Sequence, residues 1–322
     1  MIISKTPLRI SFVGGGTDIA DYYQAGRGAV VSAAINKYIY VTVHKRFDSS
    51  LRVSYTQTEI VNHADELEHS LVRACLEMAG IDSGIEITSI GEVPAGTGLG
   101  SSSALTVGLL NALYTYQGIN LSSQELLDKA CEIEINRLHQ PIGKQDQAAA
   151  SFGGLNHFSC HANGAVERRR LELSPEDFSR LESQLVLFYT GVTHAAGEIL
   201  QDQRQDMEKK RRAMDEMRDQ ADRLYDRLET EGFGPYFGQL LRDGWERKRT
   251  LSGKITNSEI DRLYQAGLDA GATGGKLLGA GGGGFLLFYC EQEKQDALRA
   301  ALNLRQMPFR VARYGSRIVY FS

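Results

Sequence analysis

Apolar residues along the chain follow two recurring patterns, one typical of strands and one typical of helices. Segments that alternate, or that are rich in β-branched and aromatic residues, predict strands at residues 5–13, 28–35, 38–43, 51–55, 85–90, 155–158, 166–173, 185–189, 285–289, 309–311 and 318–320. Apolar residues at helical spacing predict helices at residues 65–79, 104–113, 122–139, 174–184, 233–251, 258–270 and 291–303. Strands and helices are interspersed, and no sequence repeat is visible.

Local signals refine two of the helical regions. Ser122 and Glu125 have capping-box spacing at the start of one helix, and Pro141 ends it. The region 195–231 is strongly charged, and its apolar residues form only a thin stripe of Ile199, Met207, Met214, Met217, Leu224 and Leu228. Because coiled-coil heptads are lacking, this region predicts a helix with one solvated face that lies against a domain.

Three glycine-rich stretches interrupt these patterns, and the densest is residues 94–104, between a predicted strand and a predicted helix. Glycines allow backbone N–H groups to converge, and the helix N-terminus adds partial positive charge, so this stretch predicts an anion-binding loop. Its three serines could cap the helix, and one could also reach a metal ion. An ordinary strand-to-helix turn needs one glycine and one cap, not this density.

The other unusual stretches lie near the start, the middle and the end of the chain. Three glycines followed by Thr17 and Asp18 end the first predicted strand, where these two residues could orient a hydroxylated ligand or cap a helix. Residues 143–154 place Lys144 and Asp146 among small and amide residues, before a Gly-Gly turn. The third glycine-rich stretch, residues 274–284, leads into a predicted strand.

Composition and charge limit the kinds of protein that this chain can be. The chain has 322 residues, 42% apolar and 24% charged, which fits a globular protein of two domains with a boundary near 174–184. A net charge of −4 argues against a protein built around nucleic acid. No apolar run approaches the roughly 20 residues of a membrane span, and we expect no signal peptide. Four scattered cysteines without metal-binding spacing lead us to expect a cytoplasmic protein with reduced thiols.

Several classes of phosphate-binding protein are excluded by motif context. Residues 279–284 satisfy G-x-G-x-x-G, but a strand follows them where a dinucleotide-binding site needs a helix. No glycine-lysine pair is followed by serine or threonine, so the chain is not a P-loop NTPase. The H-R-D and D-F-G motifs of protein kinases are also absent.

In order and spacing, residues 7–18, 94–104 and 276–284 resemble the three motifs of the GHMP kinases. The resemblance covers nearly the whole chain. It implies an α+β fold of two domains, residues 1–180 forming an N-terminal ATP-binding domain and residues 181–322 a C-terminal domain, with the nucleotide in the cleft between them. It also implies a phosphotransferase that uses ATP and Mg²⁺ and takes an alcohol group as acceptor.

Within this family, the first motif resembles that of the D-glycero-D-manno-heptose 7-phosphate kinases, as do residues 143–147 and 245–248. Galactokinases carry Glu-His where this chain has Gly15 and Gly16, which disfavours galactose. The resemblance therefore implies phosphorylation of the anomeric 1-hydroxyl of the heptose 7-phosphate, in nucleotide-activated heptose and surface polysaccharide synthesis. A fucokinase-like sugar 1-kinase and a catalytically silent sugar sensor on the same scaffold are the alternatives.

The resemblance also implies roles for individual residues. The loop over the ATP phosphates comprises Pro94, Gly96, Thr97, Gly98, Leu99, Gly100, Ser101, Ser102 and Ser103. Ser102 and Glu134 would hold Mg²⁺, since hydroxyl and carboxylate oxygens suit a hard cation; Ser101, Ser103 and Glu132 are their rivals.

By the same resemblance, Asp146 aligns with the family's catalytic aspartate, which accepts the proton of the sugar hydroxyl. Arg9 aligns with the basic residue that pairs with that aspartate. An arginine there would also offset charge on the transferring phosphoryl group. The residues expected to contact the substrate are Gly15, Gly16, Thr17, Asp18, Lys144, Gly281, Gly282 and Gly283. The 7-phosphate needs a second anion site, for which Lys37, Lys45, Arg46 and Lys144 are unranked candidates. The implied partner is a small sugar phosphate, with no nucleic acid or membrane, and a homodimer is compatible with the sequence.

Overall fold

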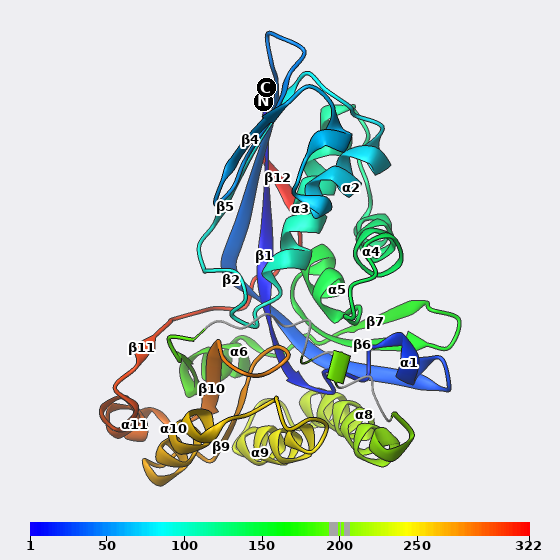
Figure 1. The fold of residues 1–322 in the computed structure, drawn as a ribbon. Coiled ribbons are helices and arrows are strands. Elements are labelled where there is room, and N and C mark those ends of the chain that lie inside the picture. The colour runs from blue at the N-terminus through cyan, green and yellow to red at the C-terminus, as the bar shows by residue number, and fades with distance from the viewer. Residues whose placement is uncertain (193–198, 200, 203–206) are drawn as a thin grey trace.

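Two β-sheets, each packed against helices, make up the computed structural model (Figure 1). The structure describes residues 1–192, 199, 201–202 and 207–322. The larger, eight-stranded sheet contains β1 (Ile2–Val13), β2 (Arg27–Lys45), β3 (Leu51–Ser54), β4 (Thr58–Val61), β5 (Ile85–Gly91), β6 (Leu155–His161), β7 (Val166–Arg170) and β12 (Arg317–Phe321). Its order is β12-β1-β2-β5-β3-β4, and β6 pairs with both β2 and β7. The smaller sheet has the order β11 (Arg305–Gln306), β8 (Leu185–Tyr189), β10 (Phe285–Tyr289) and β9 (Gly274–Leu277).

The long β1–β2 ladder carries the first part of the site. The two strands predicted at 28–35 and 38–43 are one strand, β2, with an irregularity between them. Pro7 pairs with Tyr38 while its neighbour Leu8 pairs with Ile35, so two residues of β2 are left over at this point. Because proline has no N–H for the ladder, a bulge lets both strands continue past it.

Helices α2 (Ser70–Ala79), α3 (Ser101–Tyr116), α4 (Ser123–Cys131) and α5 (Gln145–Phe152) lie on one face of the larger sheet (Figure 1). Helix α3 is buried along most of its length and packs directly on β1 and β2. The approach is close, because a Cβ added at Gly108 would lie 2.6 Å from the Thr6 hydroxyl. The predicted capping box is confirmed: Ser122 accepts from the Glu125 N–H, and the Glu125 side chain bonds back to the Ser122 N–H.

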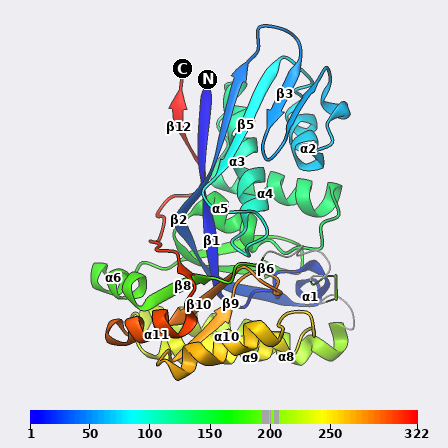
Figure 2. The ribbon, with the colours of Figure 1, turned by 60° about the vertical axis from the view of Figure 1, so that its left-hand side comes forward.

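Helices α6 (Pro175–Gln184), α9 (Tyr236–Arg249), α10 (Ser258–Asp269) and α11 (Gln295–Leu302) lie around the smaller sheet (Figure 2). Helix α8 (Met207–Thr230) packs against α9 and against β2 of the larger sheet. Trp245 is buried there beside Tyr264. The stripe predicted on the charged helix faces inward, since Met214, Met217 and Leu228 are buried. The part of that prediction that falls on 195–198, 200 and 203–206 lies outside the described residues.

Several element boundaries differ from the sequence prediction. The helix expected over 122–139 is α-helical only to Cys131 and continues as a π-helical segment, Glu132–Arg137. The strand expected at 309–311 is wrong, because that segment makes only an isolated bridge between Val311 and Ile35. Its N–H groups find other partners: the Val311 N–H donates to Glu182, for example. The short strands β4, β9 and β11 were not predicted, and β9 begins with two glycines.

The two termini meet at the edge of the larger sheet. Strand β12 pairs antiparallel with β1, and the Met1 ammonium donates to the Ser322 carbonyl at 2.6 Å. The last strand of the chain therefore joins the sheet that β1 begins, although the smaller sheet is built from residues between them. The division into domains at residues 180 and 181 stays a prediction. Among the described residues, no helix has the length and apolar character needed to span a membrane.

Candidate active site

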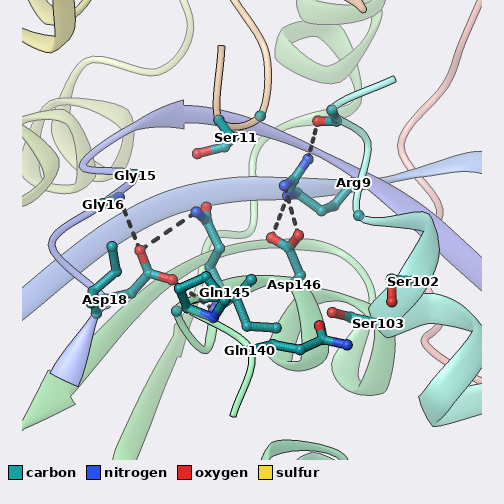
Figure 3. A pocket seen from close by; sticks show the side chains of 18 of the residues that line it. Arg9, Ser11, Gly15, Gly16, Asp18, Ser102, Ser103, Gln140, Gln145 and Asp146 are labelled. Atoms are coloured by element: carbon teal, nitrogen blue, oxygen red, sulfur yellow. Dashed lines mark hydrogen bonds and ion pairs between the residues drawn. The ribbon is translucent and has the colours of Figure 1, made fainter. Parts of the chain in front are cut away.

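A cavity of 340 Å³ opens where the glycine-rich loops of the chain meet (Figure 3). Segments far apart in the sequence line it: β1, the loop after β1, the N-terminus of α3, the segment before and within α5, the end of α9 and the loop after β9. Its lining residues are Arg9, Ser11, Gly15, Gly16, Asp18, Ile19, Gly96, Gly98, Gly100, Ser101, Ser102, Ser103, Gln140, Pro141, Ile142, Gly143, Gln145, Asp146, Lys248, Gly279 and Ala280.

The second and third glycine-rich stretches pack backbone against backbone. A Cβ added at Gly98 would lie 2.5 Å from the Leu278 carbonyl oxygen, and one at Gly279 would lie 2.4 Å from the Gly98 Cα. Larger residues would force the loops apart. Gly100 then adopts a left-handed conformation (φ 75°) at the start of α3, where no described side chain caps the helix. The free N–H groups of this turn are available to an anion.

Arg9 and Asp146 form a bidentate ion pair in the cavity, as Figure 3 shows. Arg9 Nε donates to Asp146 Oδ1 at 2.7 Å and Arg9 Nη2 to Oδ2 at 2.8 Å. The third nitrogen, Nη1, donates to the Gly98 carbonyl at 2.5 Å. Arg9 is buried on β1, whereas the Asp146 side chain keeps 24% of its surface exposed. The arginine thus fixes the carboxylate while leaving it accessible from the cavity.

Ser102 and Glu134 are also in contact. The Ser102 hydroxyl donates to Glu134 Oε1 at 3.1 Å, and Gln147 Nε2 donates to Oε2 at 2.6 Å. Burial raises the pKa of Glu134 to about 7, against the opposing effect of hydrogen bonds from Ser103, Gln147 and Ser102. Its neighbour Glu132 faces the surface and accepts a hydrogen bond from Asn136. The structure therefore separates the two acids that the sequence left as rivals.

The oxygen donors at this point fit a hard cation. A hydroxyl and a carboxylate supply part of a coordination shell and leave positions for phosphate oxygens and water. No group of three or more His, Cys, Asp or Glu residues with metal-binding geometry occurs in the part of the chain that the structure describes. A cation held here would therefore take much of its shell from a bound phosphate.

Asp18 is a buried carboxylate at the other end of the cavity. It accepts backbone hydrogen bonds from Gly16 and Gln145, both at 3.0 Å. Burial raises the pKa of Asp18, and these two N–H groups partly oppose that effect. A Cβ added at Gly143 would lie 1.9 Å from Asp18 Oδ2, so the glycine is required by this close approach.

Two buried polar atoms at the cavity lack a partner among the described residues. They are the Ser11 hydroxyl oxygen and Gln145 Oε1. A buried polar atom without a hydrogen bond is costly, so a ligand that supplies hydroxyl groups would be favoured here. Neither residue is among the predicted site residues, although Ser11 lies in the first motif and Gln145 in the stretch 143–147.

Some predicted substrate residues do not line the cavity. Thr17 is buried in the loop, where its hydroxyl donates to the Ala29 carbonyl at 2.9 Å. Lys144 points elsewhere: its ammonium donates to the Gly164 carbonyl at 2.5 Å and lies 5.4 Å from the Tyr23 ring centre. Three other predicted substrate residues also lie outside the lining: Gly281, Gly282 and Gly283. So do three residues predicted for the ATP loop, Pro94, Thr97 and Leu99, and three candidates for the second anion site, Lys37, Lys45 and Arg46.

Lys248 is a cavity residue that was missed. It lies in the last turn of α9, is buried, and donates to the Gly279 carbonyl. The sequence signal for Lys248 is its place in residues 245–248, a stretch that resembles the heptose 7-phosphate kinases but to which the sequence analysis assigns no role.

Comparison of the whole sequence with known proteins shows the family to which the chain belongs. The sequence model of the GHMP kinases N terminal domain matches residues 53–154, and that of the GHMP kinases C terminal domain matches residues 230–307. The chain belongs to the GHMP kinases, and it is an ATP-dependent phosphotransferase with an alcohol group as acceptor. The predicted family and the α+β fold are confirmed.

Particular relatives narrow the comparison. The chain is 33% identical to a D-glycero-alpha-D-manno-heptose 7-phosphate kinase of Campylobacter jejuni, over 95% of this chain and 94% of that protein. A crystal structure of a D-glycero-D-manno-heptose 1-phosphate kinase from Bacteroides thetaiotaomicron superposes with a TM-score of 0.82 over 100% of both chains, at 27% identity. An L-fucokinase/L-fucose-1-P guanylyltransferase of Bacteroides fragilis is 27% identical over 93% of this chain but only 35% of that protein.

Proposed function

We propose that this kinase transfers the γ-phosphoryl group of ATP to the anomeric 1-hydroxyl of D-glycero-D-manno-heptose 7-phosphate, giving the 1,7-bisphosphate. The similarity to a heptose 7-phosphate kinase over nearly the full length of both chains supports this substrate. The match to the fucokinase covers about a third of a longer protein, so it is weaker support for fucose. The product would enter nucleotide-activated heptose and surface polysaccharide synthesis.

The contact between Arg9 and Asp146 carries the proposed mechanism. Asp146 accepts the proton of the 1-hydroxyl as the hydroxyl oxygen attacks the γ-phosphorus. The bond from that phosphorus to the bridging oxygen breaks, and ADP leaves with the electron pair. Arg9 holds the carboxylate in place through two hydrogen bonds, and its charge offsets that of the transferring phosphoryl group.

The loop at 96–103 and the N-terminus of α3 bind the ATP phosphates in this proposal, because they line the cavity and no described side chain caps the helix there. Ser102 and Glu134 would hold Mg²⁺, which neutralises phosphate charge when it is bound. Asp18, Ser11 and Gln145 would hydrogen-bond the sugar hydroxyls, since each presents a buried polar atom at the cavity. The nucleotide would lie between domains 1–180 and 181–322.

A substrate panel tests the proposal. Release of ADP is measured with D-glycero-D-manno-heptose 7-phosphate, the same heptose without phosphate, L-fucose and D-galactose. We expect kcat/KM for the heptose 7-phosphate to exceed that for the other sugars by at least about 10²-fold, the discrimination available when a charged group finds its partner. A preference for L-fucose would favour the fucokinase-like alternative instead.

A single-turnover experiment separates a kinase from a silent sensor. Enzyme in excess over radiolabelled ATP is mixed with the sugar panel, and labelled sugar phosphate is measured. Binding of ATP and sugar without any transfer would favour the sensor, whereas one equivalent of product supports the kinase.

A further inference from the structure

Lys248 is a buried cation on the cavity wall. It lies in the last turn of α9, with only 6% of its surface exposed, and lines the cavity beside Gly279 and Ala280. Its ammonium donates one hydrogen bond, to the Gly279 carbonyl. No ion pair of Lys248 is found among the described residues.

Its two neighbours in the same helical turn behave differently. Arg247 Nε lies 3.0 Å from a Glu216 carboxylate oxygen, and an Arg249 nitrogen lies 3.1 Å from Asp261. Both arginines are about 30% exposed and have acidic partners. The most deeply buried cation of this turn is therefore the one without an acid. An ammonium in that position is costly to bury unless an anion reaches it.

The charges around the cavity leave room for an anion. Arg9 is already matched by Asp146. Asp18 is held by backbone N–H groups and makes no ion pair among the described residues. Lys276 is a second buried ammonium near Lys248 and Arg9, but it donates to the Phe12 carbonyl at 2.9 Å and does not line the cavity. Lys248 is thus the cavity's one described cation that has no acidic partner.

The same burial sets the protonation of this lysine. Desolvation lowers the pKa of Lys248 to about 8, with the Arg9 charge as the second cause, while Asp18 and Asp146 oppose the shift. The side chain therefore still carries its proton at neutral pH.

We propose that Lys248 binds a phosphate group in the cavity and is a phosphate-binding residue of this kinase. This inference rests on the proposed function and extends it. Two phosphates could supply the anion: the γ-phosphate of ATP and the phosphate that the sugar substrate already carries. Both offer a dianionic group to a single ammonium donor, and the experiment below distinguishes them.

The test compares wild type, Lys248→Met and the control Arg247→Met, which removes a cation of the same helical turn outside the cavity. Each protein is titrated with sodium phosphate, against sodium chloride at equal ionic strength, and thermal unfolding is followed. We expect phosphate to raise the Tm of wild type and of Arg247→Met, and expect Lys248→Met to need at least about tenfold more phosphate. Equal responses in all three proteins, or no response in wild type, would overturn the proposal.

Steady-state kinetics then identify the phosphate. If the sugar phosphate is the ligand, Lys248→Met raises KM for the sugar phosphate and leaves KM for ATP unchanged. If the γ-phosphate is the ligand, Lys248→Met raises KM for ATP and leaves KM for the sugar phosphate unchanged. Should the methionine variant fold poorly by circular dichroism, Lys248→Gln replaces it, since glutamine can still donate to the Gly279 carbonyl. The phosphate titration does not depend on the sugar, so failure of the heptose assignment would be seen separately.

Discussion

Replacing Glu134 by glutamine should make the metal-free protein more stable at alkaline pH and not at acidic pH. Burial raises the pKa of this carboxyl from its ordinary 4.5 to about 7. Below pH 4.5 the carboxyl is protonated in both the folded and the unfolded chain. Between pH 4.5 and about 7 only the unfolded chain gives up the proton, so the free energy of unfolding falls as the pH rises.

The size of this loss follows from the shift. About 2.5 pKa units, at about 1.36 kcal/mol each, correspond to about 3 kcal/mol above pH 7. Glu134 is fully buried, so solvent does not screen the effect. For a chain of this length that free energy corresponds to a Tm difference of about 5 °C. Glutamine has nearly the same shape and can accept from Ser102, so it removes the charge without leaving a cavity.

The assay is thermal unfolding in EDTA at pH 5.0 and pH 8.5, with Glu132→Gln as the matched control two residues away on the surface. We expect the Tm of Glu134→Gln to exceed that of wild type by about 5 °C at pH 8.5 and by much less at pH 5.0. Glu132→Gln should match wild type at both. The same difference between Glu134→Gln and wild type at the two pH values would refute the reasoning.

Three further variants probe the reacting groups. Asp146→Asn should lower kcat by roughly 10²- to 10⁴-fold while ATP still binds, measured by turnover and by calorimetry; full activity would exclude Asp146 as the base. Arg9→Lys should lower kcat by at least about tenfold, because lysine cannot form the bidentate pair, and an unchanged kcat would show that the pair is dispensable. Gly143→Ala should lower kcat/KM for the sugar by about 10²-fold, because its Cβ would lie 1.9 Å from Asp18; unaltered kinetics would mean that Asp18 need not hold its position.

Site residues that each belong to a short motif with a specific pattern could be predicted from the sequence. Arg9 and Asp146 are 137 residues apart, yet each belongs to a short stretch with a specific pattern, and the structure brings them into contact. The same holds for Ser102, although the choice of Glu134 over Glu132 depended on which acid the π-helical segment turns inward.

The parts that depend on packing could not be predicted. Lys144 is two residues from Asp146, but it precedes the first turn of α5, and its ammonium donates to the Gly164 carbonyl instead of lining the cavity. Lys248 reaches the cavity only because α9 packs beside β9 and places its last turn under Gly279. Likewise, β9 has two glycines and little strand propensity, and it forms because β10 offers it a partner.

The site of phosphoryl transfer is tested most directly by the identity of the product. The wild-type protein is incubated with ATP, Mg²⁺ and D-glycero-D-manno-heptose 7-phosphate, and the product is examined by phosphorus-31 NMR. We predict two sugar phosphorus signals, one from the original 7-phosphate and a new one coupled to the anomeric proton, together with one equivalent of ADP. A new phosphorus signal coupled to any other sugar proton, or no new signal while ADP accumulates, would contradict phosphorylation of the 1-hydroxyl.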